Sequence, residues 1–165
     1  MAKDLSPEAL QQEAADFRDS FQSVLLATTS PQGQPDASYA PCIVDDNQAI
    51  YVFISELAQH TKNLLSVPQA SLLFIADETD SRNIFARKRL SLNSIAEALP
   101  RDDPHWNDLL TQFEDKFGQT ISLLKSLPDF HLIRFNIQQG NYVRGFAQAY
   151  ALSGNQLEIL SLRKS

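Results

Sequence analysis

The residues best suited to chemistry are three consecutive cations, Arg87, Lys88 and Arg89, in a chain whose formal net charge is −6. Arg82 lies just upstream, and residues 90–93 alternate between leucine and polar side chains, a pattern that predicts a half-buried strand. Guanidinium groups at the start of a strand have a restricted direction and form charge-assisted hydrogen bonds with phosphates or carboxylates. We interpret the segment either as a site for a small anionic ligand or as a solvated strand edge that discourages aggregation.

A second candidate group is His60, Thr61 and Lys62, which fall in the first turn of a helix predicted over residues 57–66. Free backbone N–H groups at a helix start, together with a hydroxyl and a cation, are typical of a small anion site. The alternative is an ordinary amphipathic helix with a solvated Lys62.

The remaining chemistry-bearing residues form no recognisable catalytic or metal motif. His60, His105 and His131 are too scattered for a metal pair, and the sequence has neither a glycine-rich nucleotide loop nor a readable Ser-His-Asp arrangement. We expect His105 to be exposed at a helix start and His131 to lie on a buried strand face. Catalytic residues therefore stay unassigned, no metal site is expected, and any chemistry would depend on a bound cofactor.

Composition limits the class of protein. The 165 residues, 43% of them hydrophobic, fit one domain spanning 1–165 with a substantial core. The acidic balance disfavours nucleic acid as a partner, and the single Cys42 excludes an internal disulfide. Because the sequence has neither the apolar core of a signal peptide nor a run of transmembrane length, we expect a cytoplasmic protein without a membrane partner.

The pattern of the chain predicts the elements that position these residues. A helix is expected up to residue 21, and a barrel over 22–165 contains an inserted helix at about 104–126. Strands are predicted at 24–29, 36–44, 49–55, 70–76, from the basic segment to about 99, at 130–138, 141–152 and 157–162. Gln139-Gly140 is the predicted hairpin turn between two of them. The expected fold is mainly β (α+β), a six- to seven-stranded antiparallel barrel with peripheral helices.

The sequence resembles the FMN-binding split-barrel superfamily of pyridoxamine 5′-phosphate oxidase, and within it the haem-utilisation branch (HugZ/HutZ type). The resemblance covers about residues 21–154. It is carried by Ser23-Val-Leu-Leu-Ala-Thr-Thr, Ser38-Tyr-Ala-Pro41, Phe53-Ile-Ser, His60-Thr-Lys-Asn63, Asp77-Glu78, Phe85-Ala-Arg-Lys-Arg-Leu90, Pro128-Asp-Phe130 and Gly140-x-x-Val-x-Gly-Phe-x-x-Ala-Tyr150.

The resemblance implies a homodimer of split barrels with two pockets for a small, planar, anionic cofactor at the subunit interface. The cofactor-binding residues that it implies are Ser38, Tyr39, Ser55, His60, Thr61, Lys62, Arg87, Arg89 and Asp129. In this reading His60, Thr61 and Lys62 match the phosphate site of the flavin enzymes. The arginines of the basic segment lie near haem, with Asp129 in a supporting hydrogen bond.

Three functions follow as hypotheses. The first is a haem-utilisation protein that binds haem or a related tetrapyrrole; its described relatives bind iron through a histidine in the C-terminal tail. No histidine follows His131 here, so binding is expected rather than haem degradation. The second is an FMN-dependent oxidoreductase, although strand 36–44 lacks the cations of the flavin enzymes. The third is a non-catalytic binding or regulatory protein.

Overall fold

The computed structural model describes residues 4–162. Its strands are β1 (Ser23–Thr29), β2 (Pro35–Val44), β3 (Ile50–Ser55), β4 (Gln69–Ile75), β5 (Arg89–Ala98), β6 (Phe130–Gly145), β7 (Gln148–Ser153) and β8 (Glu158–Leu162). Its helices are α1 (Pro7–Asp19), α2 (Gln59–Ser66), α3 (Trp106–Phe117) and α4 (Thr120–Leu124), with short 3₁₀ turns η1 (Glu78–Asp80) and η2 (Ile84–Ala86).

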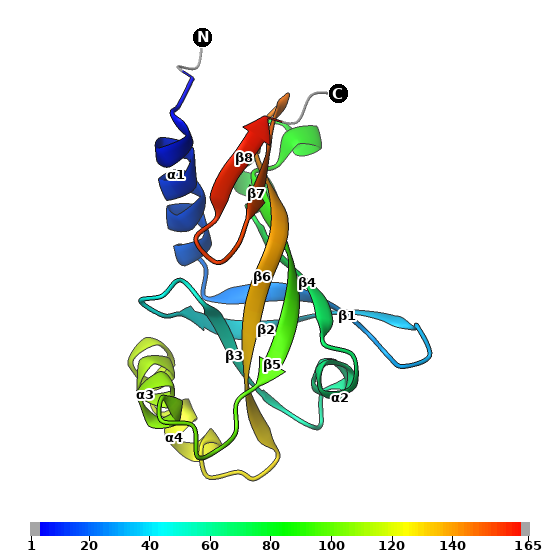
Figure 1. Ribbon diagram of the computed structural model, residues 1–165, viewed down its shortest axis with the longest axis vertical. Helices are drawn as coiled ribbons and strands as arrows, with labels where there is room; N and C mark the ends of the chain where they lie inside the picture. Colours follow the sequence, from blue (N-terminus) through cyan, green and yellow to red (C-terminus); the bar gives the residue numbers. More distant parts are fainter. Residues whose placement is uncertain (1–3, 163–165) are drawn as a thin grey trace.

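The strands form one antiparallel sheet in the order β3-β2-β1-β4-β5-β6-β7-β8, and an additional pairing of β3 with β6 closes the first six into a barrel. Strands β7 and β8 extend the sheet beyond the barrel and lie beside α1 (Figure 1). The mainly β, antiparallel barrel is thus confirmed, with six strands in the closed ring.

The hairpin predicted at Gln139-Gly140 is wrong, because β6 runs unbroken from Phe130 to Gly145. A Cβ atom on Gly140 would lie 2.5 Å from the Ser91 carbonyl oxygen and 2.7 Å from Leu92 Cδ2, so this glycine permits close strand packing rather than a turn. The chain irregularity nearby is a bulge, where pairing shifts between Asn93 and Ser94. The turn comes later, between Gly145 and Gln148.

Two hydrophobic clusters stabilise the fold. One fills the barrel with fully buried side chains such as Leu72, Leu92 and Phe135. The other covers the outside of the barrel, where Trp106 and Phe113 of α3 pack against Phe53 of β3. Figure 1 shows α3 and α4 together at the end of the barrel opposite β7 and β8.

The inserted helix expected at about 104–126 is two helices. Gly118 has a φ of +80°, a left-handed conformation that ends α3, and α4 begins at Thr120. The apolar period had suggested one helix because Ile121 continues the buried face of Phe113 across the break.

Helix α1 is attached to the sheet by a polar network. Glu13 accepts hydrogen bonds from the buried Tyr142 hydroxyl (2.6 Å) and from Arg144 Nε (2.7 Å) and Nη2 (3.1 Å). At the end of the helix, the buried Arg18 donates from Nη2 to Gln48 in the β2–β3 turn at 2.6 Å. These bonds fix α1 against β6 and the β2–β3 turn, so its position depends on the buried Arg18 and on the half-buried Glu13 and Arg144.

None of the helices in residues 4–162 is both long and apolar enough to cross a membrane. The cytoplasmic location stays a prediction.

Candidate functional site

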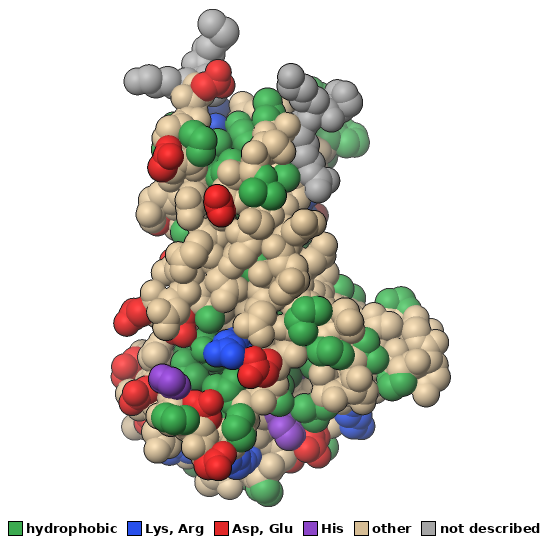
Figure 2. All heavy atoms as spheres, in the orientation of Figure 1, with side chains coloured by type: hydrophobic (Ala, Val, Ile, Leu, Met, Phe, Trp, Pro, Cys, Tyr) green, Lys and Arg blue, Asp and Glu red, His purple; other side chains and the backbone are tan. Residues whose placement is uncertain are grey.

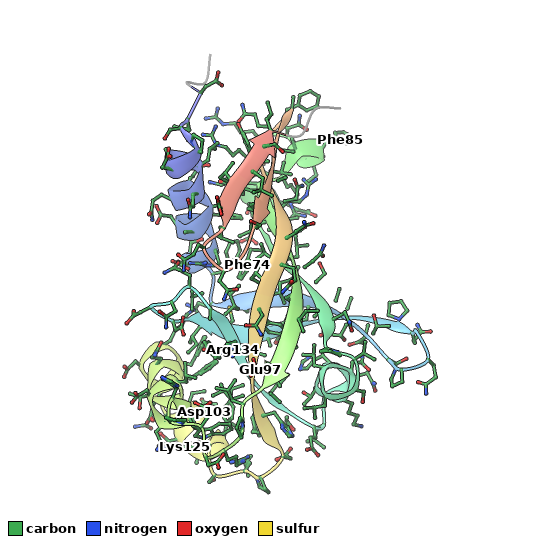
Figure 3. The ribbon with its side chains drawn as sticks, viewed as in Figure 1. Phe74, Phe85, Glu97, Asp103, Lys125 and Arg134 are labelled. Atoms are coloured by element: carbon green, nitrogen blue, oxygen red, sulfur yellow. The ribbon has the colours of Figure 1, made fainter. Side chains whose placement is uncertain are left out.

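The nine expected cofactor-binding residues lie in three separate groups within one chain. Arg87 and Arg89 lie at the β7–β8 end of the molecule, and Figure 3 shows Phe85 there. Ser38, Tyr39, His60, Thr61 and Lys62 lie on β2 and α2, and Ser55 and Asp129 lie where β3 meets β6. In Figure 1, α2 lies near the other end of the molecule from the tip of β8.

The three cations of the basic segment have three different surroundings. Arg87 donates to the Ala76 carbonyl oxygen from Nε (3.0 Å) and Nη2 (2.6 Å), and its Nη1 lies 3.8 Å from Glu78. Lys88 lies inward, with Nζ 5.0 Å from the centre of the Phe17 ring. Within the part of the chain that the structure describes, Arg89 makes one hydrogen bond, from Nη1 to the Arg87 carbonyl oxygen at 3.1 Å. Of the three, Arg89 is the cation that lines a surface groove.

This groove, which we call the aromatic groove, has a volume of about 540 Å³ between η2 and the β6–β7 turn. Its lining residues are Phe85, Ala86, Arg89, Val143, Gly145, Phe146, Ala147, Gln148, Ala149 and Leu162. The Phe85 and Phe146 side chains are 89% and 75% exposed, unusually high for large aromatic residues. Two exposed rings beside a single guanidinium fit a flat, largely apolar molecule that carries an anionic group.

The β6–β7 turn holds Phe146 outward through a strained backbone conformation. The next residue, Ala147, has a φ of +58°, a left-handed conformation that alanine adopts rarely. Strained residues of this kind persist where the surrounding structure holds them, often beside ligand sites. The small residues Gly145, Ala147 and Ala149 line the groove beside this turn.

The first turn of α2 differs from the basic segment, because its polar groups are largely without partners. The cap residue Ala58 supplies no side-chain hydrogen bond, and the turn contains no acidic residue. The Thr61 side chain is fully buried, and its hydroxyl has no hydrogen-bond partner among the described residues. Lys62 is exposed. A free helix start with an exposed cation favours an anion.

His60, in this same turn, is held by β2. Its Nδ1 lies 2.8 Å from the Ser38 hydroxyl. Burial lowers the pKa of the half-buried imidazole below its ordinary value, and the Asp36 carboxylate opposes this shift only in part. Burial thus favours the neutral form of the ring.

Ser55 and Asp129 form the third group. The Ser55 hydroxyl donates to Asp129 Oδ2 at 2.6 Å, and the Asp129 carbonyl oxygen accepts from the backbone N–H of Glu56. Glu56 in turn pairs with His131 Nε2 at 2.6 Å. The His131 side chain is 28% exposed, so it lies at the barrel rim rather than on a fully buried face. Within residues 4–162, no three His, Cys, Asp or Glu side chains cluster in a way that could hold a metal ion.

The outer face of the sheet joins these groups. Cross-strand partners place six uncharged residues in one row over six strands: Tyr39, Leu25, Leu73, Ser91, Asn141 and Ala151. Leu25 is 44% exposed and Tyr39 is 64% exposed. Two hollows, of about 520 Å³ and 420 Å³, meet at Ser91 on this face. Figure 2 shows the middle of the drawn face, over β6, without charged side chains.

Sequence reasoning missed part of this arrangement. It identified the basic segment but not Phe85 and Phe146 as neighbours of Arg89, and it did not find the uncharged row. No sequence signal marks the row, because residues 24–27 of β1 are all apolar and the outward direction of Leu25 and Ala27 is set by the packing of the barrel.

The chain matches a family model described as Pyridoxamine 5′-phosphate oxidase over residues 10–144. It is 40% identical over 148 residues to Heme oxygenase HutZ of Vibrio cholerae, which covers 90% of this chain and 84% of that protein. A crystal structure of HutZ, called there a heme storage protein, superimposes with a TM-score of 0.75 at 38% identity over 81% of this chain and 94% of that one. The structure of Campylobacter jejuni ChuZ gives a TM-score of 0.84 at 28% identity, over 96% of this chain and 65% of that one.

Proposed function

The chain belongs to the pyridoxamine 5′-phosphate oxidase family, in the haem-utilisation branch, and from this premise we propose that it binds haem or a related tetrapyrrole at a homodimer interface. The observation that carries the proposal is the aromatic groove, where Arg89 is the only charged residue among the described lining residues. A tetrapyrrole is flat and apolar with two carboxylates on one edge, which fits exposed rings beside one guanidinium. Haem supplies redox chemistry when bound; the residues of this chain position it.

Arg89 is the residue of the basic segment that we assign to a propionate. It lines the groove and makes one hydrogen bond, whereas Arg87 is occupied by the Ala76 carbonyl oxygen and Glu78. Charge-assisted hydrogen bonds from a guanidinium to a carboxylate are short and strong when water is partly excluded.

A second copy of the chain completes the site. The uncharged row on the outer sheet face runs from Tyr39 at one side to Ala151 at the other, with Ser91 near the middle. A two-fold axis through the middle of such a face lays the Tyr39 end of one copy on the Ala151 end of the other. The α2 group of one subunit then approaches the aromatic groove of its partner, which one chain alone does not achieve.

The test of haem binding is titration of the purified full chain with haemin. We expect a saturable Soret change and an affinity about tenfold lower in Arg89→Met, equivalent to roughly 1.4 kcal/mol. Arg82→Met is the matched control, because Arg82 is an exposed arginine of the same region outside the groove. Absence of a saturable Soret change in the wild-type protein rejects haem as the ligand.

The test of the dimer is sedimentation of the wild type and of Leu25→Glu. A charge in the uncharged row should dissociate the dimer, since an unpaired buried carboxylate is costly at an interface. Gln22→Glu, at an exposed position before β1, is the control. A monomeric wild-type protein at micromolar concentration would contradict the shared site.

FMN is the second candidate ligand, and the free first turn of α2 favours it. A phosphate there would accept hydrogen bonds from the helix start and pair with the exposed Lys62. FMN fluorescence quenching that Lys62→Ala weakens about tenfold, without a Soret response to haemin, would favour a flavin oxidoreductase. If the protein responds to neither ligand, the remaining hypothesis is a non-catalytic binding or regulatory protein.

A further inference from the structure

Among residues 4–162, the aromatic groove contains no side chain that ligates haem iron. Proteins hold haem iron with histidine, cysteine, methionine or tyrosine. The described residues that line the groove are phenylalanine, alanine, valine, glycine, leucine, Arg89 and Gln148. A protein ligand to the iron must therefore come from outside the groove.

Several potential iron ligands within residues 4–162 are bonded to other side chains, are buried, or lie far from the groove. His131 Nε2 is paired with Glu56 at 2.6 Å. His105 precedes α3, which Figure 1 shows at the end of the molecule opposite β7 and β8. Cys42 is buried, and burial raises the pKa of its thiol to about 11, which disfavours the thiolate that binds metals. Tyr51 and Tyr142 donate their hydroxyls to carboxylates.

His60 has the arrangement of a metal-binding histidine. A ligating imidazole binds metal through one nitrogen while a neighbour fixes the other, which sets the orientation of the ring. The Ser38 hydroxyl fixes Nδ1 at 2.8 Å, and Nε2 makes no hydrogen bond to any residue in 4–162. The ring is half-buried, so its orientation is restricted while one edge stays accessible.

The position of His60 relative to the outer face gives it access to a partner's groove. Its hydrogen-bond partner Ser38 precedes Tyr39 on β2 and lines the 520 Å³ hollow of the uncharged face. The two-fold arrangement proposed above lays this end of the face on the partner's β7 end, where the aromatic groove lies. Tyr39, also at this end, is the competing candidate.

We infer that His60 of one subunit ligates the iron of haem held in the aromatic groove of the other subunit. The inference rests on the proposed haem-binding function. Each composite site then takes its iron ligand from one chain, and its aromatic rings and Arg89 from the other.

The first experiment is spectroscopy of the haemin-loaded full chain. In the wild type we expect the optical and electron paramagnetic resonance spectra of an imidazole ligand, and an iron–imidazole stretch in the resonance Raman spectrum of the ferrous form. His60→Ala should lose these signatures and regain them with added imidazole. Ser38→Ala should shift the stretch because the second ring nitrogen loses its partner.

His131→Ala, His105→Ala and Tyr39→Phe are the matched controls, and each should keep the imidazole signature. Loss of the signature in His131→Ala or His105→Ala but not in His60→Ala overturns the inference, as does a tyrosinate spectrum that Tyr39→Phe abolishes. Haemin binding that leaves the His60→Ala spectrum unchanged rejects the ligand but retains the proposed function. A wild type that binds no haemin rejects the proposed function itself.

A mixing experiment tests whether the ligand crosses the interface. Chains carrying His60→Ala are refolded with chains carrying Arg89→Met. The free haemin concentration is kept below the dissociation constant of the Arg89→Met protein for haemin. A hybrid dimer regains one intact composite site if His60 acts on the partner's groove, so about a quarter of all sites should show the imidazole signature. If His60 acts on the groove of its own chain, the hybrid has no intact site and the signature stays absent, which contradicts the inference.

Discussion

The basic segment at the head of β5 and the first turn of α2 both contain cations, yet they differ in what their polar groups bind. In the basic segment, Arg87 bonds a carbonyl oxygen twice and Lys88 lies over an aromatic ring. In the first turn of α2, Lys62 is exposed and the buried Thr61 hydroxyl is without a partner in residues 4–162. The larger cluster of charge is thus mainly structural, whereas the smaller one is free to bind.

This difference shows that the number of cations in a segment does not measure its capacity to bind anions. Intramolecular partners consume most of the charge in the basic segment and leave Arg89 for a ligand. Substitutions in the two regions should consequently separate stability from binding.

The largest effect is expected where α1 meets β6. Glu13→Ala leaves the buried Tyr142 hydroxyl and the Arg144 guanidinium without their carboxylate, and we expect a loss of about 3 kcal/mol in the free energy of unfolding. Urea denaturation measures it, with Gln12→Ala, at an exposed position of the same helix, as the control. A loss below about 1 kcal/mol would show that the network does not anchor the helix.

The second prediction separates the two arginines. Arg87→Met should lower the free energy of unfolding by about 2 kcal/mol, because it removes two bonds to the Ala76 carbonyl oxygen. The haemin affinity of Arg87→Met should stay within about twofold of the wild type. Arg89→Met should instead weaken haemin binding and leave the free energy of unfolding nearly unchanged. Thermal unfolding and haemin titration on the same samples measure both quantities. If Arg87→Met weakens haemin binding more than Arg89→Met does, the assignment of roles is wrong.

The third prediction concerns pH. Burial raises the pKa of Glu13, but hydrogen bonds from Arg144 and Tyr142 and the charge of Lys88 outweigh it, so the pKa in the folded protein lies below the ordinary value. The stabilisation is therefore complete above the unfolded pKa of about 4.3 and is lost as pH falls through the folded value. The stability difference between wild type and Glu13→Gln should narrow as pH falls from about 5 to 3, by about 1 kcal/mol or less. A stability difference between the two proteins that is constant over this pH range would contradict the prediction.

The smallest effect is expected in α2 and has the opposite sign. Thr61→Val removes a buried hydroxyl that has no partner and should raise the free energy of unfolding by about 0.5 kcal/mol. Thr28→Val is the matched control, because the Thr28 hydroxyl accepts from Asn63 Nδ2 at 3.0 Å and its loss should destabilise the protein. Destabilisation by both substitutions would mean that Thr61 has a partner after all.

Much of the fold could be predicted because its signals are local. Ser6 and Pro7 mark the start of α1, and β1 and β4 are short, mostly apolar runs, with Pro31 just after the first and Pro68 just before the second. Gly140 misled because a glycine in a strand and a glycine in a turn look alike locally. The difference lies in the approach of Ser91 and Leu92, which are about fifty residues away in sequence.

The candidate site could be predicted only as segments. The basic run was visible, but the bond from Arg87 to Ala76 depends on how β4 and β5 pair, and the bond from His60 to Ser38 depends on how α2 packs on β2. Which cation or imidazole stays free is a tertiary property. No single sequence segment predicts which groups of two chains meet at an interface.

The continuity of β6 has a consequence for the dynamics of the molecule. One strand pairs with β3 within the barrel and with β7 in the extension, while β5 follows it along its other side. The extension therefore cannot detach as an independent cooperative unit without exposing amides that also belong to the barrel. Hydrogen–deuterium exchange at β6 should accordingly proceed through global opening along its whole length, even where the groove lies at its far end.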